Sequence, residues 1–163
     1  MRKRSALQAE IRQTRPFRSS AEEATLGIVM TATIVRRAVA QVVEPMGITP
    51  AQYNVLRILR GAGARGLPTL AVRDRLLEEA PGITRLMEKL GRAGFVTRDR
   101  STPDRRQVMC FITPKGLALL RKLDSVISTA DELGAAGLTT GERRELICLL
   151  DKVRAAARER NRK

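Results

Sequence analysis

The side chains best suited to a chemical task lie in the segment from Pro81 to about Ala93. Four apolar residues in it recur at positions i, i+3, i+4 and i+7, which predicts a helix with one core-facing stripe: Ile83, Leu86, Met87 and Leu90. The opposite face is then exposed, and a helix about 12 Å in diameter fits the major groove of DNA. This face is predicted to carry Gly82, Thr84, Arg85, Glu88, Lys89 and Arg92.

The first turn of this helix is the end that would enter the groove and read bases. Arg85 has the planar fork that can bond guanine N7 and O6 together, and Thr84 can contact a thymine methyl group or donate from its hydroxyl. Gly82 would let the backbone approach DNA closely, although a glycine here equally suits a flexible loop. We therefore predict that Gly82, Thr84 and Arg85 read bases.

Long cationic side chains away from the helix tip are better suited to phosphate groups than to bases. The predicted contacts to the DNA backbone are Arg73, Lys89, Arg92, Arg98 and Arg100. A solvated surface is the alternative explanation for these cations, because such residues also cover ordinary helices.

A charged turn, Ser101 to Arg106, links two predicted strands. At the tip of such a hairpin Arg105 and Arg106 would lie over the minor groove, whose narrow A·T-rich segments attract arginine. Asp104 is unsuited to touching DNA, and we expect it to orient Arg106 through a charge-assisted hydrogen bond. A charged solvated turn remains the simpler alternative.

The elements that position these side chains begin at recognisable caps. Three segments have a capping pattern and predict helix starts: Ser20–Glu23, Thr49–Gln52 and Thr139–Glu142. The predicted order is helices at about 21–44, 49–61, 69–77 and 81–93, strands at 95–100 and 107–113, and helices at about 114–133 and 140–158. Three helices followed by a two-stranded hairpin is the order of a winged helix-turn-helix, so the fold class is mainly α with a small β-hairpin wing.

The helices at both ends carry more apolar surface than one chain can bury. The first helix is apolar on more than one face, and the last two offer similar surfaces. We expect the two ends to intertwine in a homodimer. The expected organisation is a flexible basic arm (1–19), a dimerisation helix (20–48), a DNA-binding winged unit (49–113) and C-terminal dimerisation helices with a basic tail (114–163). The arm could be a solvated tail, or contact DNA or the partner.

Composition limits the function. Lys and Arg number 31 against 17 Asp and Glu, a formal charge of +14, which favours a polyanionic partner, either nucleic acid or an anionic membrane. No stretch reaches the roughly eighteen uninterrupted apolar residues of a membrane-spanning helix, and no signal peptide is recognisable. We expect a cytoplasmic, nucleoid-associated protein that binds double-stranded DNA and no membrane.

The chain contains no histidine, so the usual general base and the usual Cys/His zinc site are missing, and neither an enzyme, a metal nor a cofactor is predicted. Cys110 and Cys148 each lie in an apolar stretch and are predicted to be small buried hydrophobes. The main alternative is a sequence-tolerant architectural or RNA-binding protein, which the charge fits equally well. A purely protein-binding winged helix is disfavoured by the cationic helix face and wing.

Several motifs in register resemble the MarR family of transcription regulators. They are Leu70–Leu76 (LAVRDRL), Ile83–Leu90 (ITRLMEKL) with Gly94-Phe-Val96, Asp104-Arg-Arg106 and Thr113–Gly116 (TPKG). The resemblance implies an obligate triangular dimer, a minor-groove role for Arg106 with Asp104 bracing it, and repression relieved by a small, often aromatic, ligand. Such an apolar effector would lie between the dimer helices and the winged unit, with Phe17, Met30, Met46 and Tyr53 as its expected pocket, although these residues are equally suited to the core.

Two departures from the family pattern affect these expectations. Ala80 stands where the family often has a Ser or Thr cap, so the predicted recognition helix has a weak cap. The family's thiol-based peroxide sensors use a cysteine near the N-terminal helices, where this chain has none. Oxidant sensing is therefore not expected.

Overall fold

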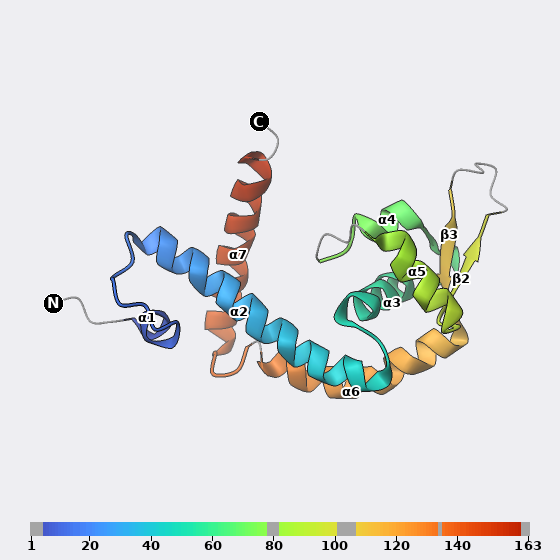
Figure 1. The fold of residues 1–163 in the computed structure, drawn as a ribbon, viewed down its shortest axis with the longest axis horizontal. Helices are drawn as coiled ribbons and strands as arrows, with labels where there is room; N and C mark the ends of the chain where they lie inside the picture. Colours follow the sequence, from blue (N-terminus) through green and yellow to red (C-terminus); the bar gives the residue numbers. More distant parts are fainter. Residues whose placement is uncertain (1–4, 78–81, 101–106, 134, 161–163) are drawn as a thin grey trace.

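The computed structural model describes residues 5–77, 82–100, 107–133 and 135–160. Long helices dominate it, beside one small antiparallel sheet, which confirms the predicted fold class (Figure 1). The helices are α1 (Ala6–Glu10), α2 (Ser20–Val43), α3 (Pro50–Ala62), α4 (Thr69–Arg73), α5 (Ile83–Arg92), α6 (Pro114–Leu133) and α7 (Thr140–Arg160), with the short 3-10 turns η1 (Glu44–Met46) and η2 (Gly63–Arg65). The strands are β1 (Leu67–Pro68), β2 (Val96–Asp99) and β3 (Met109–Ile112), in the order β1-β3-β2.

Local hydrogen bonds explain where the helices start. Thr49 forms the predicted capping box at α3, exchanging bonds of 3.3 and 2.8 Å with Gln52. Thr139 and Glu142 do the same for α7. The predicted cap of α2 is wrong by one residue, because Ser19, not Ser20, accepts from the Glu22 N–H.

The sheet differs from the prediction by one strand. β1 pairs with β3 over only two residues, Leu67 opposite Cys110 and Pro68 opposite Met109, which is too short to show an alternating pattern in sequence. α4 ends at Arg73 rather than near Leu77, because the chain continues as turns in which the Arg75 and Leu76 N–H groups donate to carbonyls three residues earlier.

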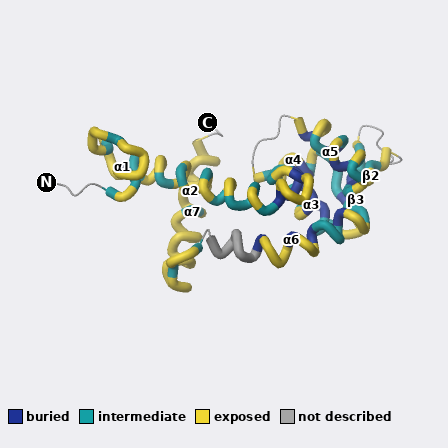
Figure 2. The backbone as a smooth tube through the Cα atoms, turned by 60° about the horizontal axis from the view of Figure 1, so that its bottom comes forward, coloured by how far each residue is buried: buried dark blue, intermediate teal, exposed yellow. Residues whose placement is uncertain are grey.

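The core lies within the winged unit and along the facing side of α6 (Figure 2). Its fully buried side chains come from α2, α3, α4, α5, β3 and α6: Val43, Val55, Leu56, Leu59, Val72, Met87, Leu90, Cys110, Leu120 and Leu123. α2 and α6 run side by side away from this core, so that they link the winged unit to the rest of the chain (Figure 1).

The described part of the N-terminal segment, which the sequence predicts as a flexible arm, contains the short helix α1 and contacts α2. Ser5 caps α1, and the buried Gln8 donates from Nε2 to the Arg15 carbonyl at 3.1 Å. Leu7 lies beside Gly27 of α2. These contacts join irregularly spaced residues, so periodicity in the sequence could not reveal them.

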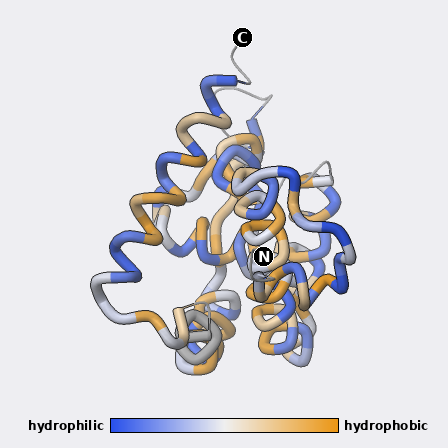
Figure 3. The backbone as a smooth tube through the Cα atoms, turned by 90° about the vertical axis from the view of Figure 1, so that its left-hand side faces the viewer, coloured by the Kyte–Doolittle hydropathy of each residue, from blue (hydrophilic) through white to orange (hydrophobic). Residues whose placement is uncertain are grey.

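Large apolar side chains remain exposed on the helices at the ends of the chain. They lie on α2 (Leu26, Ile28, Val29 and Ile34) and on α7 (Leu146, Ile147, Leu149 and Val153). Every residue of α7 except Leu150 is exposed, and hydrophobic and hydrophilic stretches alternate along this helix (Figure 3). Within the described residues, the segment Ser20–Met46 is also long and apolar enough to cross a membrane by length and composition.

Candidate nucleic-acid interface

Helix α5 has the predicted division into two faces. Ile83, Met87 and Leu90 are buried in the core, and Leu86 is half-buried. The opposite face exposes Thr84, Arg85, Lys89 and Arg92, with Gly82 exposed just before the helix and Glu88 half-buried at its side. The structure thus brings the three predicted base-reading residues together at the N-terminal end of α5.

Among the described residues, no side chain caps the N-terminal end of α5. Gly82 is the N-cap residue, and it has no side chain to accept from the first-turn N–H groups. Those N–H groups and the helix dipole favour a negative charge at this end. Arg85 adds a full positive charge one turn away, so the end of α5 suits an anionic partner.

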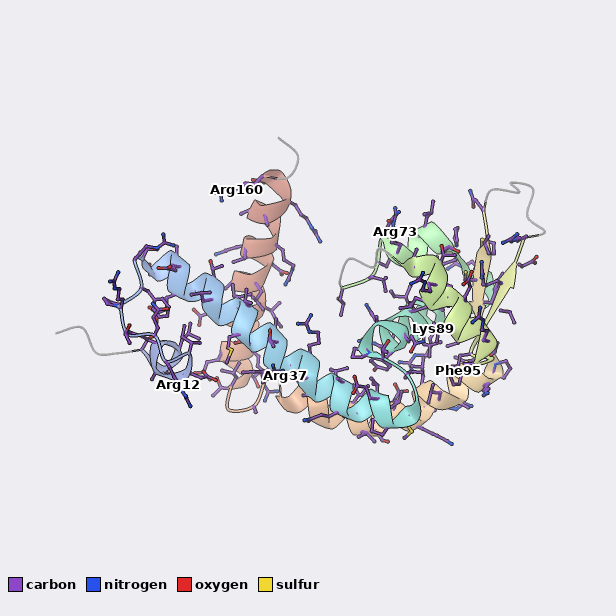
Figure 4. The ribbon with its side chains drawn as sticks, viewed as in Figure 1. Arg12, Arg37, Arg73, Lys89, Phe95 and Arg160 are labelled. Carbon is purple, nitrogen blue, oxygen red and sulfur yellow. The ribbon has the colours of Figure 1, made fainter. Side chains whose placement is uncertain are left out.

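The cations predicted to contact phosphates lie in different surroundings. Lys89 and Arg92 extend from the exposed face of α5, and Arg100 is exposed just after β2. Arg73 lies on α4, where Nε and Nη2 donate to Asp74 Oδ1 at 3.1 and 3.0 Å. Figure 4 shows Arg73 and Lys89 on the winged unit, and Arg12 at the far end of α2.

Arg98 is only partly exposed and lies beside Glu88, and its predicted phosphate contact stays a prediction. Its side chain is 25% exposed, and Nη1 lies 3.9 Å from Glu88 Oε1 of α5. Its Nε is buried and finds no hydrogen-bond partner within the described part of the chain. The cause is strand alternation, because Arg98 follows the buried Val96 by two residues and therefore shares its face.

The predicted minor-groove contacts fall outside the described residues. This applies to Arg105 and Arg106 at the tip of the wing and to Asp104, which was expected to brace them. Their roles stay predictions. The flanking strands β2 and β3 pair in register from Val96–Ile112 to Asp99–Met109, so the described part of the hairpin extends towards that tip.

A cleft of about 560 Å³ lies between the exposed face of α5 and the start of α3. Its lining combines apolar groups (Ile48, Leu86, Leu90, Ala93 and Phe95) with polar and charged ones (Thr49, Gln52, Arg85 and Lys89), and with Gly47 and Gly82. None of the four residues expected to form a ligand pocket lines it. Tyr53 is buried in the core, Met46 is exposed, and Phe17 and Met30 are half-buried.

The two cysteines differ, which corrects the prediction that both are buried. Cys110 is fully buried on β3, and this burial raises the pKa of its thiol, although a hydrogen-bonding contact of 3.4 Å with Thr69 opposes the shift. Cys148 is exposed on α7. Its apolar neighbours suggested burial, but they face a surface that this single chain does not cover.

Three packed helices with an exposed cationic third helix, followed by a β-hairpin, define a winged helix-turn-helix protein. No family model matches the sequence. The regulator TtmR of Methylorubrum extorquens is 36% identical over 107 residues, which is 66% of this chain and 53% of TtmR. The chain thus spans about half the length of that curated relative. A transcriptional repressor of Mycobacterium tuberculosis is 27% identical over 82% of this chain and 96% of its own length.

Solved structures are similar over most of the chain. The MarR transcription factor of Planctomyces limnophilus is 33% identical, with a TM-score of 0.65 over 83% of this chain and 98% of that one. A MarR mutant of Escherichia coli solved with operator DNA is 26% identical, with a TM-score of 0.70 over 77% of this chain and 89% of that one. The chain belongs to the MarR family of winged helix-turn-helix transcription regulators.

Proposed function

We propose that this protein is a sequence-specific DNA-binding transcription regulator that places α5 in the major groove of its operator. The observation that carries the proposal is the exposed face of α5, where Thr84 and Arg85 lie in the first turn and Lys89 and Arg92 follow along the helix. The similar Escherichia coli MarR, solved with operator DNA, supports this use of the fold. Arg85 would bond a guanine edge, and Lys89, Arg92 and Arg100 would contact phosphates.

The proposed regulator is a homodimer. The exposed apolar side chains on α2 and α7, such as Val29 and Ile147 at 58% and 59% exposure, support a second copy of the chain as the group that covers them. A two-fold dimer would place two α5 helices about one helical turn of DNA apart, ~34 Å, and read a pseudo-palindromic operator. Binding there as a repressor would block access of other proteins to the same DNA.

The cleft beside α5 supports the proposal that a small effector binds there and weakens the binding of the protein to DNA. Phe95, Leu86 and Ile48 provide apolar walls, while Arg85 and Lys89 provide positive charge, so the lining suits a small aromatic acid. An acid bound there would neutralise two cations that the proposed docking needs for DNA. The lining of this cleft does not include the four residues that the sequence predicts as a ligand pocket, which are Phe17, Met30, Met46 and Tyr53.

The proposed docking predicts that Arg85→Ala reduces affinity for a duplex selected by the wild-type protein from random sequences, by ~1–3 kcal/mol. The reason is the loss of a bidentate contact to one base in each half-site. Fluorescence anisotropy titration against this duplex and a scrambled one measures the effect. Arg121→Ala is the matched control, because it removes the same charge from the exposed surface of α6.

A preference of the wild type for the selected duplex by ~10³-fold or more supports the specific regulator. Equal and salt-sensitive binding to both duplexes would favour a sequence-tolerant architectural protein instead. Equal affinity of the wild type and Arg85→Ala for the selected duplex would contradict the proposed role of α5.

A further inference from the structure

The C-terminal end of α5 is held by the turn that starts α6. The Thr113 hydroxyl donates to the Gly94 carbonyl at 2.7 Å and accepts from the Gly116 N–H at 3.1 Å. The Thr113 backbone N–H donates to the Phe95 carbonyl at 3.0 Å. One threonine therefore joins the residues that end α5 to the first turn of α6.

Lys115 adds a second contact to the same end of α5. Its Nζ donates to the Ala93 carbonyl at 2.8 Å and lies 5.1 Å from the centroid of the Phe95 ring. Ala93 is the C-cap residue of α5, where the helix dipole presents partial negative charge. A cation at this place satisfies a free carbonyl and also contacts an aromatic face, so it stabilises this end of α5 in two ways.

The backbone approach at this turn leaves no room for a side chain at Gly116. A Cβ atom there would lie 2.5 Å from the Phe95 carbonyl oxygen and 2.8 Å from Ile112 Cγ1. At the other side of the contact, Gly94 ends α5 with a φ of 75°, in the left-handed region that favours glycine. The two glycines allow the two helix ends to meet closely.

The two ends of α5 are thus fixed in different ways. The N-terminal end, which carries Thr84 and Arg85, receives no side-chain cap from the residues that the structure describes, whereas the C-terminal end is bonded to α6. α6 packs along α2, and the Arg60 guanidinium of α3 bonds both carboxylate oxygens of Asp124 in α6, at 3.0 and 2.7 Å. A shift of α6 would therefore reach α5 through its C-terminal end.

We propose that Thr113 and Lys115 are positioning residues that set the orientation of α5 against α6, and that they determine operator specificity without touching DNA. In Figure 4, Phe95 lies where α5 and β2 approach the start of α6, and Lys89 lies on α5 itself, before Phe95 in the chain. The inference rests on the proposed DNA-binding role of α5. It identifies a contact, outside the DNA-facing surface, through which a shift of α6 would change how α5 reads bases.

The test uses the full-length protein with Lys115→Met, which keeps an apolar stem but loses the charge and the donor. Lys115→Arg is the conservative variant, and Thr113→Val removes the hydroxyl alone. Lys122→Met is the matched control, because it removes the same charge from the exposed surface of α6. Two readouts apply: amide hydrogen exchange at Gly94 and Phe95 without DNA, and the ratio of affinities for the selected and scrambled duplexes.

We expect Lys115→Met and Thr113→Val to speed exchange of the Phe95 amide, which bonds the Leu90 carbonyl, and to lower the affinity ratio by about tenfold. Lys115→Arg and Lys122→Met should keep the wild-type ratio. Equal losses on both duplexes would show that Lys115 contacts phosphate and would overturn the proposal. Faster exchange with an unchanged ratio would also overturn it, since the contact would then be structural only.

Failure of the proposed function is distinguishable from failure of this inference. If the wild type does not prefer the selected duplex, DNA specificity itself is absent, and the exchange data still report whether Lys115 and Thr113 hold α5. Exchange at Phe95 that is unchanged in both variants would overturn the positioning role whatever the DNA result.

Discussion

At the scale of the residue, Arg85 and Arg98 show how position decides what a cation does. Arg85 is exposed in the first turn of α5, where it is free to reach a base edge. Arg98 shares the inward face of β2 with Val96, and its guanidinium lies against Glu88. We infer that Arg98 supports the packing of the sheet against α5, because its side chain is partly buried and its guanidinium lies 3.9 Å from Glu88 Oε1.

The two thiols are predicted to react differently in the native protein. Cys110 is fully buried with a raised thiol pKa, so little of it is thiolate at neutral pH, whereas Cys148 is exposed. Iodoacetamide should therefore modify Cys148 and leave Cys110 unmodified, as measured by peptide mass spectrometry. Cys148 lies two residues from both Leu146 and Leu150, away from the apolar stripe that a partner would cover. Modification of Cys110 first would contradict the burial, and unfolding in urea should make both accessible.

At the scale of the element, the start of α7 depends on an ionised cap. Hydrogen bonds from the Thr139 backbone N–H and hydroxyl hold the pKa of Glu142 below its ordinary value. The folded state therefore favours the carboxylate. This stabilisation is fully present above the ordinary carboxyl pKa of about 4.3, and it is lost as the pH falls through the lower folded value.

Glu142→Gln should consequently lower stability at pH 7, and the difference from the wild type should shrink as the pH falls below about 4. Urea unfolding followed by circular dichroism measures that difference at each pH. Glu145→Gln is the control, since it removes the same charge one turn later in α7 without touching the cap. A pH-independent difference for Glu142→Gln would show that the carboxylate is not the stabilising form.

Elements with strong local signals could be predicted from the sequence. The capping boxes at Thr49 and Thr139 and the apolar stripe of α5 are set by neighbours within one or two turns, so short patterns contain them. β1 could not be predicted in this way, because its two residues are held by pairing with residues of β3 that lie more than forty positions later in the chain. The motif Thr113–Gly116 is visible in the sequence, but the contacts of Thr113 with Gly94 and of Lys115 with Ala93 depend on the fold.

The sequence likewise predicts those parts of the candidate site that depend on local patterns, and not those that depend on packing. Thr84, Arg85, Lys89 and Arg92 follow directly from the helical period of α5. The alternation that begins at the buried Val96 predicts that Arg98 lies on the same face of β2, a signal that the charge of Arg98 alone does not give. The cleft between α3 and α5 joins residues about forty positions apart, and only the packed structure brings Gln52 and Lys89 together.

At the scale of the whole molecule, the chain has a packed end and an incompletely packed end. The core fills the winged unit, while the N-terminal half of α2 and most of α7 are exposed (Figure 2) and carry large apolar residues. In the proposed dimer, a second copy would cover these helices and so stabilise the chain. The proposed dimer would also fix the distance between two α5 helices, so that stability and base reading would depend on the same contact.

The most direct test of this account is a hydroxyl-radical footprint on the selected duplex. A dimer with one α5 in each of two adjacent major grooves should protect two symmetric blocks centred about 10 base pairs apart on one face of the DNA. Protection spread evenly along the duplex, with no symmetric pair of blocks, would contradict a dimeric, sequence-reading regulator.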